Sequence, residues 1–202
     1  MRLRDYRPED ERSWVRCRVL AFLDTAYFDD VHRHKERYTR PAVELVAEHR
    51  GEVIGLLDVE CEERAGTVCS DRPGLGAMIW PLAVVPEFRR RGVGTALLRE
   101  AERRVHARGI RRLEAWTRDD DWVRVWYERQ GFARIQSYLH VYVDGVEAGD
   151  AIHSGLPGLL PVSVFAHYVG EDRDGIRARF RRVHECALYE RRLPGEGTRA
   201  DP

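Results

Sequence analysis

The stretch with the clearest chemical signal is VVPEFRRRGVGTALL, residues 84–98, where three arginines and two glycines separate an apolar run from a helix-like run. Amide groups at a helix N-terminus have no partner inside the helix, and the helix dipole favours an anion there. Glycine lets a phosphate approach these donors because it has no side chain. Three interpretations are open: a phosphate cradle, a nucleic-acid patch, and a bare strand-to-helix turn with exposed arginines.

Two well-known phosphate motifs do not fit this stretch. GVGTAL, residues 92–97, lacks the third glycine of the dinucleotide fingerprint, and no Gly-Lys-Ser/Thr follows as in a nucleotide P-loop. The chain has 34 Lys+Arg and 34 Asp+Glu, so its formal net charge is zero and lacks the basic surplus typical of nucleic-acid binders. We therefore expect no nucleic-acid partner. Two interpretations of the stretch stay open, a phosphate cradle and a bare turn.

Hydrophobic periodicity predicts the elements that must position this stretch. Strands are expected at 2–7, 43–49, 53–60, 77–85, 111–117, 132–143 and 161–169, with a further segment at 184–193. Helices are expected from residue 8 to about 23, in a polar stretch ending before residue 41, and at 93–108, 121–130 and 173–180. The mixture of hairpins and crossovers predicts a mixed α/β sheet, not a fully parallel one.

Pro81 lies in the middle of the apolar run AMIWPLAVV, residues 77–85, which otherwise indicates a central strand covered on both faces. Proline has no N–H to donate to a neighbouring strand. The strand therefore needs a bulge or an unpaired stretch at this position.

Length and composition limit the class of protein. At 202 residues, the chain is one ordinary domain or one domain with an appendage. The four cysteines are far apart and form no Cys-x-x-Cys pair, and no apolar run is long enough for a membrane span. We expect reduced thiols, a cytoplasmic location, no membrane association and no metal.

Two motifs together carry a family resemblance. Arg89-x-x-Gly92-x-Gly94, after a strand and opening an amphipathic helix, resembles the pyrophosphate signature of the GNAT superfamily of acyl-CoA-dependent N-acyltransferases. WYERQGF, residues 126–132, resembles the later helix-to-strand motif of the same family. The resemblance covers roughly residues 2–143 and matches the predicted element order. It implies a mixed, centrally splayed sheet flanked by helices, with the bulge of the splayed strand where Pro81 stands.

The resemblance implies acetyl-CoA as co-substrate and assigns residues to it. The backbone at the end of the strand would bind the pantetheine arm, the following amides would bind the pyrophosphate, and the first arginine would fix the loop. These residues are Leu82, Ala83, Val84, Arg89, Arg90, Arg91, Gly92, Val93, Gly94 and Thr95. Tyr127 would protonate the departing thiolate, with a purely structural role beside Trp126 as the alternative. Asp120 stands where the family often has Asn, which puts a role beside the pantetheine in doubt.

The base that deprotonates the acceptor cannot be carried over, because AMIWPLAVV contains no acid where family members often have a glutamate. Asp58 and Glu60 share a strand face and are candidates for attracting an amine, with solvated acids as the alternative. Glu114 is either paired with an arginine or functional. His140, between Tyr138 and Tyr142 on one strand face, is a candidate base or a structural histidine.

The segment LDTAYFDDV, residues 23–31, falls where the family commonly lines its acceptor pocket. Asp24 and Tyr27, with the acids at 29 and 30, favour a cationic acceptor. The functional prediction is acetyl transfer to a primary amine of a small cationic molecule. The alternatives are a protein or peptide acceptor and a non-catalytic acyl-CoA-binding module.

The predicted organisation has three parts. Residues 1–144 form the acyltransferase core, and residues 145–193 form a C-terminal α/β extension. That extension completes the sheet, shapes the acceptor side or provides a homodimer surface. The tail, 194–202, is expected to be disordered.

Overall fold

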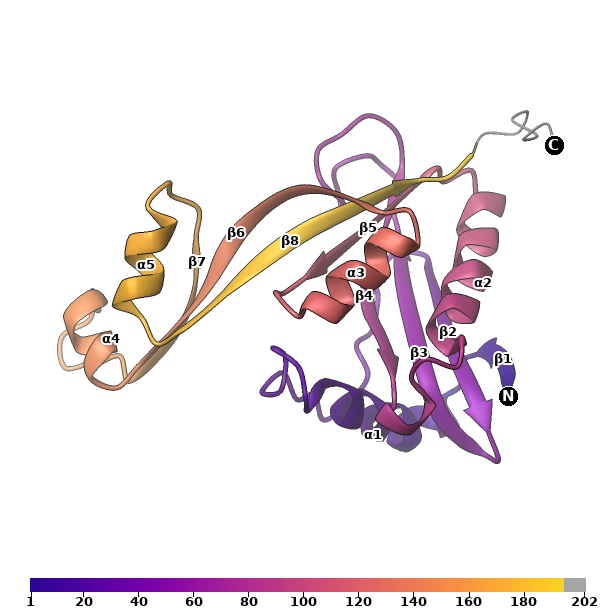
Figure 1. Ribbon diagram of the computed structural model, residues 1–202, viewed down its shortest axis with the longest axis horizontal. Coiled ribbons are helices and arrows are strands. Elements are labelled where there is room, and N and C mark those ends of the chain that lie inside the picture. The colour runs from indigo at the N-terminus through magenta and orange to yellow at the C-terminus, as the bar shows by residue number, and fades with distance from the viewer. Residues whose placement is uncertain (195–202) are drawn as a thin grey trace.

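The computed structural model describes residues 1–194 and contains one eight-stranded sheet with the strand order β1-β2-β3-β4-β5-β8-β6-β7 (Figure 1). The strands are β1 (Arg2–Asp5), β2 (Ala42–His49), β3 (Glu52–Cys61), β4 (Gly76–Val84), β5 (Arg112–Thr117), β6 (Ala133–Asp144), β7 (Ser163–Tyr168) and β8 (Arg182–Arg192). The helices are η1 (Pro8–Asp10), α1 (Glu11–Phe22), η2 (Pro86–Phe88), α2 (Val93–Ala107), α3 (Asp121–Arg129), α4 (Val146–Ala151) and α5 (Arg173–Arg179).

The sheet is mixed, as predicted, because β4 and β5 pair in parallel while the other neighbouring strands are antiparallel. The parallel pairing runs only from Gly76 opposite Arg112 to Ile79 opposite Ala115. Beyond these residues, β4 continues to Val84 without β5 beside it. The sheet is therefore splayed at its centre.

The irregularity expected at Pro81 is present. In the pairing of β3 with β4, Leu57 lies opposite Leu82 and Val59 opposite Ile79. One residue of β3, Asp58, therefore faces two residues of β4, Trp80 and Pro81, which is the arrangement of a β-bulge. The bulge lies directly beyond the last residue of β4 that pairs with β5.

The helices cover the two faces of the sheet unequally. The α2 face carries α2, whose Val93 packs on Gly55, and α3, whose Tyr127 stacks on Tyr189. The opposite face, the α1 face, carries α1 over β3 and β4. Figure 1 shows α2 and α3 on the near side of the strands and α1 behind them. Because side chains alternate along a strand, the even-numbered residues of β3, β5 and β8, and those of β6 from Gln136 onward, lie on the α1 face.

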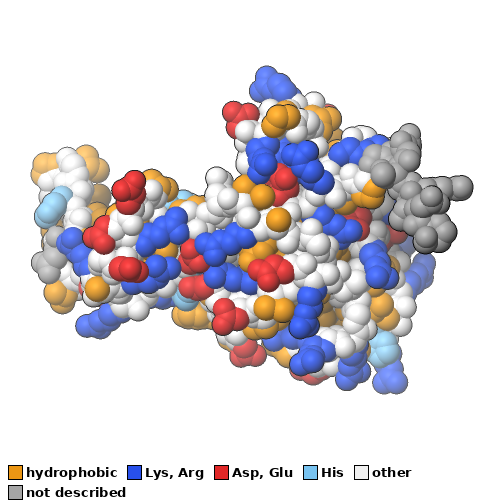
Figure 2. All heavy atoms as spheres, turned by 45° about the horizontal axis from the view of Figure 1, so that its top comes forward, with side chains coloured by type: hydrophobic (Ala, Val, Ile, Leu, Met, Phe, Trp, Pro, Cys, Tyr) orange, Lys and Arg blue, Asp and Glu red, His pale blue; other side chains and the backbone are white. Residues whose placement is uncertain are grey.

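The far ends of β6 and β8, with β7, α4 and α5, form a projection that we call the arm (residues 139–184), at the left in Figures 1 and 2. The arm has its own small core of Leu139, Val141, Val143 and Ala148, to which α5 contributes Ile176. The three β6 residues lie on the α2 face. Both arm helices therefore cover that face, and the α1 face of the arm carries no helix.

Two expectations need correction. The polar helix expected before Pro41 is wrong, because residues 24–40 are turns and irregular backbone. This segment lacks an apolar helical face and is held instead by Arg18, which binds the carbonyl and the carboxylate of Asp30. The second difference is the short helix α4, which lies where the sequence predicted no element.

Other expectations concern the tail, the membrane and the thiols. The predicted tail lies outside the described residues, except for its first residue, Pro194. No helix within residues 1–194 is both long and apolar enough to cross a bilayer. The four cysteines are free and buried.

Candidate active site

The loop between β4 and α2 adopts left-handed backbone at two positions, Arg90 with a φ of 59° and Gly92 with a φ of 79°. Left-handed backbone is uncommon for a residue other than glycine, so Arg90 is a conformational outlier. Gly92 occupies the N-cap of α2, and the first helical hydrogen bond runs from the amide of Ala96 to its carbonyl. The turn thereby places the loop directly before the open end of α2.

The amide groups of this loop are available to a ligand. Within residues 1–194, none of the amides of residues 90–95 donates to a backbone or side-chain acceptor. In the same part of the chain, neither the Arg90 nor the Arg91 guanidinium pairs with a carboxylate. Six free donors and two free cations at the positive end of a helix dipole form a site suited to an anion.

Arg89 ties this loop to its surroundings. Its Nη2 donates to the carbonyl of Ala21 at the end of α1 (2.6 Å), and its Nε donates to the carbonyl of Val84 (3.3 Å). Its guanidinium also lies 5.0 Å from the ring centroid of Trp122 on α3. The side chain therefore connects three elements around the loop.

Tyr127 lies on α3, on the α2 face of the sheet, and is buried between aromatic rings. Its ring stacks on Tyr189 with a centroid distance of 5.8 Å and meets Trp126 and Phe132 edge to face. Burial raises the pKa of its phenol well above the ordinary value, so it carries its proton at neutral pH. Within the described chain, its hydroxyl has no hydrogen-bond partner.

Glu114 is fully buried and held by partners on every side. Its carboxylate accepts from the amide of Ser70 (2.8 Å) and the hydroxyl of the same serine (2.5 Å), and it pairs with Arg112. Arg112 in turn bonds to carbonyls of the loop between β3 and β4. Of the two interpretations of Glu114, the structure therefore shows the arginine-paired one, and this network anchors the loop.

Asp58 lies on the α1 face opposite the bulge and is fully buried. Its Oδ2 binds the ammonium of Lys35 (2.8 Å) and accepts from Tyr38 (3.2 Å), while its Oδ1 has no partner within the described chain. Burial raises the pKa of the carboxyl above its usual range, against the attraction of Lys35. Lys35 also binds Glu44 and lies under the ring of Trp14. Asp58 is thus occupied by the only lysine of the chain.

Glu60 lies two residues further along β3 on the same face. Its carboxylate accepts from the indole N–H of Trp80 in the bulge (2.9 Å) and is 3.5 Å from Arg40. Glu60 is 7% exposed, whereas Trp80 is 51% exposed. Glu60 is therefore buried like Asp58, but its partners Trp80 and Arg40 are themselves partly exposed beside the splay.

His140 is held in one tautomer. Its Nδ1 accepts from Nε of Arg118 (3.1 Å), so the ring proton resides on Nε2, which faces the hydroxyl of Tyr138 at 3.3 Å. Burial, together with the charge of Arg118, lowers the pKa of His140 to about 3. The ring is neutral at physiological pH, and its lone pair is already engaged.

The acidic segment before β2 is largely neutralised. Asp29 forms a two-point ion pair with Arg182 of the arm, and Asp30 pairs with Arg18 of α1. Tyr27 accepts from the amide of Arg118 (3.1 Å) under its guanidinium. Asp24 is exposed and has no ion-pair partner within residues 1–194. The segment therefore connects body and arm, and Asp24 is its unpaired acid.

Sequence reasoning missed Arg118 and Trp116, which follow the last β5 residue paired with β4. Arg118 donates to the carbonyl of Ala26 (2.5 Å) and to His140. It therefore connects the end of β5 to the segment of residues 23–31 and to the arm. Asp120 occupies the N-cap position of α3, but its carboxylate makes no capping hydrogen bond and accepts from the amide of Ala26 (3.1 Å). The run of aspartates after Arg118 was visible in the sequence. Their neighbour Ala26, which binds both Arg118 and Asp120, lies about 90 residues earlier in the chain.

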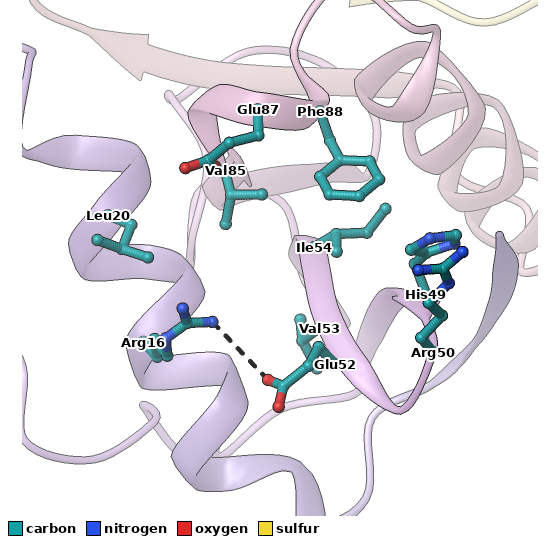
Figure 3. A pocket seen from close by; sticks show the side chains of 10 residues that line it. All are labelled: Arg16, Leu20, His49, Arg50, Glu52, Val53, Ile54, Val85, Glu87 and Phe88. Carbon is teal, nitrogen blue, oxygen red and sulfur yellow. Dashed lines mark ion pairs between the residues drawn. The ribbon is translucent and has the colours of Figure 1, made fainter.

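A pocket of about 300 Å³ opens at the end of the sheet, between α1, the β2–β3 turn and η2 (Figure 3). Leu20, Val85 and Phe88 give it an apolar lining, and the ion pair of Arg16 with Glu52 (3.8 Å) crosses its rim. None of the predicted site residues lines it. Its lining includes Val85 and Phe88, which precede the loop of residues 90–95, but no residue of that loop.

Comparison with known proteins gives one family match. Residues 41–134 match the family model described as "Acetyltransferase (GNAT) domain". This range contains β2 to β5, the anion-binding loop and α3.

Several solved structures have a similar fold. One is an acetyltransferase of the GNAT family from Streptococcus pneumoniae (TM-score 0.59, 14% identity, 96% of this chain and 99% of that chain covered). A second is a ribosomal-protein-alanine N-acetyltransferase from Brucella melitensis (0.57, 14%, 96% and 100%). A third is NAA60 from Arabidopsis thaliana in complex with a bisubstrate analogue (0.54, 16%, 96% and 99%). At these identities the likeness concerns the fold.

Proposed function

Because residues 41–134 match the GNAT acetyltransferase family model, we propose that this chain is a GNAT N-acetyltransferase that transfers an acetyl group from acetyl-CoA to a primary amine of a small cationic molecule. The observation that carries the proposal is the loop of residues 90–95, with six amides that have no acceptor within the described chain. These donors lie at the end of β4 beyond the point where β5 has separated from it. A phosphate site beside an open strand edge fits a pyrophosphate followed by an extended arm.

The bound co-substrate supplies the acetyl group as a thioester. The amides of residues 90–95 hold its pyrophosphate, and the free edge of β4 at Leu82, Ala83 and Val84 binds its pantetheine arm. Val84 offers this edge incompletely, because its carbonyl already accepts from Arg89. Gly94 leaves room between α2 and α3, where an added Cβ would lie 3.6 Å from Trp126.

In this proposal, the two faces of the sheet have different roles in the reaction. Tyr127 lies on the α2 face and, with its raised pKa, is a protonated acid that can donate to the departing thiolate. Glu60 lies on the α1 face beside the bulge and is positioned to attract the ammonium group of the acceptor. Asp24 adds an unpaired negative charge on the same side of the body. Co-substrate and acceptor thus approach the splay from opposite faces.

The second candidate acceptor is a protein N-terminus. The fold likeness to a ribosomal-protein-alanine N-acetyltransferase favours it. The unprotected α1 face of the arm also leaves space for an extended chain. Incubation with metabolite amines on one hand and peptides on the other separates the two, because the acetylated product is identified by its mass.

The test of the proposed function uses Gly94→Val, with Gly149→Val in α4 as the matched control. An added side chain meets only ordinary contacts at position 94 and nothing within 4 Å at position 149, so both variants should fold. Loss of several charge-assisted hydrogen bonds should weaken acetyl-CoA binding about 100-fold in Gly94→Val alone. Gly92 is less suitable because its φ of 79° strains any other residue. Calorimetry that finds equal affinity in both variants would overturn the cradle.

A further inference from the structure

The two edges of the sheet differ in how they are protected. β1, at one edge, has three charged side chains among its four residues, whereas β7, at the other edge, has none. Edge strands of proteins usually carry charges, prolines or bulges that prevent pairing with a further strand. β7 contains no proline and pairs with β6 without a register shift. The β7 edge is therefore open to another strand.

The backbone of β7 has free hydrogen-bonding groups along this edge. The amide of Gly145 donates to the carbonyl of Val162 (2.9 Å) at the end of the β6–β7 ladder. Because hydrogen-bonded and non-hydrogen-bonded pairs alternate in an antiparallel ladder, the even-numbered residues of β7 direct their amides and carbonyls towards β6. Ser163, Phe165 and His167 direct theirs outward, and none of these groups has a backbone partner within residues 1–194. A partner strand would pair with these outward groups.

Uncharged and apolar residues surround the β7 edge. Residues 151–170 contain no Asp, Glu, Lys or Arg, although these four types make up 34% of the chain. Val162 and Val169, which flank β7, are 75% and 82% exposed. The other exposed large apolar residues of the arm are Val146, Leu156, Leu159, Leu160 and Phe165. Figure 2 shows hydrophobic side chains at the free end of the arm. Such a concentration of exposed apolar surface marks an interaction site.

We propose that β7 pairs antiparallel with β7 of a second copy of this chain, so that the two sheets join into one. The two-fold axis of this dimer is perpendicular to the sheet, and each copy contributes the same surface. Residues with outward groups must lie opposite each other, and an axis at Phe165 meets this condition. Phe165 then lies beside its own counterpart, Val169 opposite Pro161, and Val162 opposite Tyr168. This register gives the outward backbone groups and the exposed apolar side chains their partners in a single contact.

A lipid surface is a poorer match for the same residues. The interior of a bilayer offers no hydrogen-bond partner, so the outward amides and carbonyls of β7 would stay unsatisfied there. The acids Glu171 and Asp172 directly follow the uncharged stretch. In the dimer these acids lie near the uncharged residues that precede β7 in the other copy, so no like charges meet. A second copy therefore fits both the backbone and the charges of this edge.

Sedimentation velocity of the full chain over a wide concentration range tests the inference. We expect a concentration-dependent dimer in the absence of acetyl-CoA and of any acceptor. A chain that stays monomeric throughout would overturn the inference, whether or not it binds phosphatidylcholine vesicles. The measurement involves no catalysis, so its outcome is independent of the proposed acetyl transfer.

Variants at Phe165 locate the two-fold axis. Phe165→Lys and Phe165→Glu each place like charges beside one another and should raise the dimer Kd about 100-fold. An equal mixture of the two variants should recover the dimer, because a lysine then faces a glutamate, and this recovery also shows that both variants fold. Phe28→Lys is the matched control, since Phe28 lies outside the arm and is 50% exposed, as Phe165 is. It should leave the Kd unchanged. A dimer that survives both Phe165 variants, or a mixture that stays monomeric, would contradict the pairing.

Discussion

The body and the arm share one sheet, but they are built differently on the α1 face. In the body, this face is closed by α1 and encloses charged groups, such as Lys35 between Asp58 and Glu44. In the arm, the continuation of the same face carries His140, His167 and other rings without a covering helix.

The cores differ as well. The main cluster extends from α1 through β2–β5 to β8 and contains most of the buried side chains, whereas the arm cluster has four fully buried members. Burial of apolar area is the main source of stability, so the arm contributes little to it. The comparison teaches that the body provides most of the stability and carries the loop that we propose binds the co-substrate, and that the arm presents a surface.

Loss of a buried leucine should show the largest difference between the regions. Leu45 of β2 and Leu139 of β6 are both fully buried, one in each cluster. Leu45→Ala should cost about 3–5 kcal/mol of the free energy of unfolding, and Leu139→Ala about 2 kcal/mol because the small arm core relaxes more readily. Urea denaturation gives both values. Equal costs would show that the arm core is as tightly packed as the body.

Removal of the buried lysine tests the closed part of the α1 face. Lys35→Met leaves the Asp58 carboxylate buried without its cation, which should cost about 3 kcal/mol at pH 8. The pKa of Asp58 is already raised by burial and rises further in the variant. The penalty is therefore present above that pKa and disappears as the pH falls and the carboxyl takes up a proton.

Arg37→Met is the control for this variant, since Arg37 is exposed and has no ion-pair partner within residues 1–194. Denaturation of both variants at pH 8 and pH 5 measures the effect. A cost for Lys35→Met that does not change with pH would show that Asp58 stays ionised.

Tyr127→Phe tests the division between the two faces. Because Tyr127 lies on the α2 face, removal of its hydroxyl should lower kcat by about 10- to 100-fold for every acceptor, with acetyl-CoA affinity unchanged. A change in a residue that only binds the acceptor should instead alter the ratio between acceptors. Steady-state kinetics with two amines distinguishes these outcomes. An unchanged kcat would remove Tyr127 from the chemistry.

The smallest predicted effect concerns the base of the arm. Asp119, before α3, accepts from Nδ1 of His184 (2.8 Å) and from the amide of Glu185 (3.0 Å) on β8. Burial alone would raise the pKa of Asp119, but these bonds outweigh it and lower the pKa to about 2. The stabilisation is present above the unfolded value near 4 and is lost as the pH falls towards 2.

Asp119→Asn should therefore be less stable than the parent protein at pH 7 by roughly 1 kcal/mol, after allowance for solvent screening of a partly exposed pair. The difference should fall to roughly a third of this value at pH 2.5, because the carboxyl of the folded protein is then still partly ionised. Urea denaturation at both pH values, with hydrogen exchange of the β8 amides, gives the comparison. A difference that is undiminished at pH 2.5 would contradict the ionic origin of the link.

Local sequence signals determined the loop and the strand break. Arg89-x-x-Gly92-x-Gly94 predicted a turn with free amides because helix starts and left-handed glycines are short-range properties of the backbone. Pro81 predicted the bulge because a missing N–H has a local consequence wherever the strand lies. The strands and most helices followed from hydrophobic periodicity for the same reason.

Side-chain partners were decided by the tertiary structure. The sequence left Glu114 either paired or functional, and the register of β5 together with the fold of the β3–β4 loop placed Ser70 and Arg112 around it. The helix expected before Pro41 was wrong because this segment is held by contacts with other elements, through Lys35 to Asp58 and through Asp30 to Arg18. Hydrophobic periodicity does not predict such contacts.

What the sequence by itself determined is therefore the resemblance to a family, the order of most elements and the turn between β4 and α2, all of which depend on neighbours along the chain. Only the tertiary structure decided that Tyr127 and Glu60 lie on opposite faces of the sheet. It likewise decided that the rings of Trp116, Tyr138 and His167, from three different strands, are in contact. The reason is physical: faces and rows depend on strand register and on where helices pack, and these are set by contacts between residues far apart in the chain.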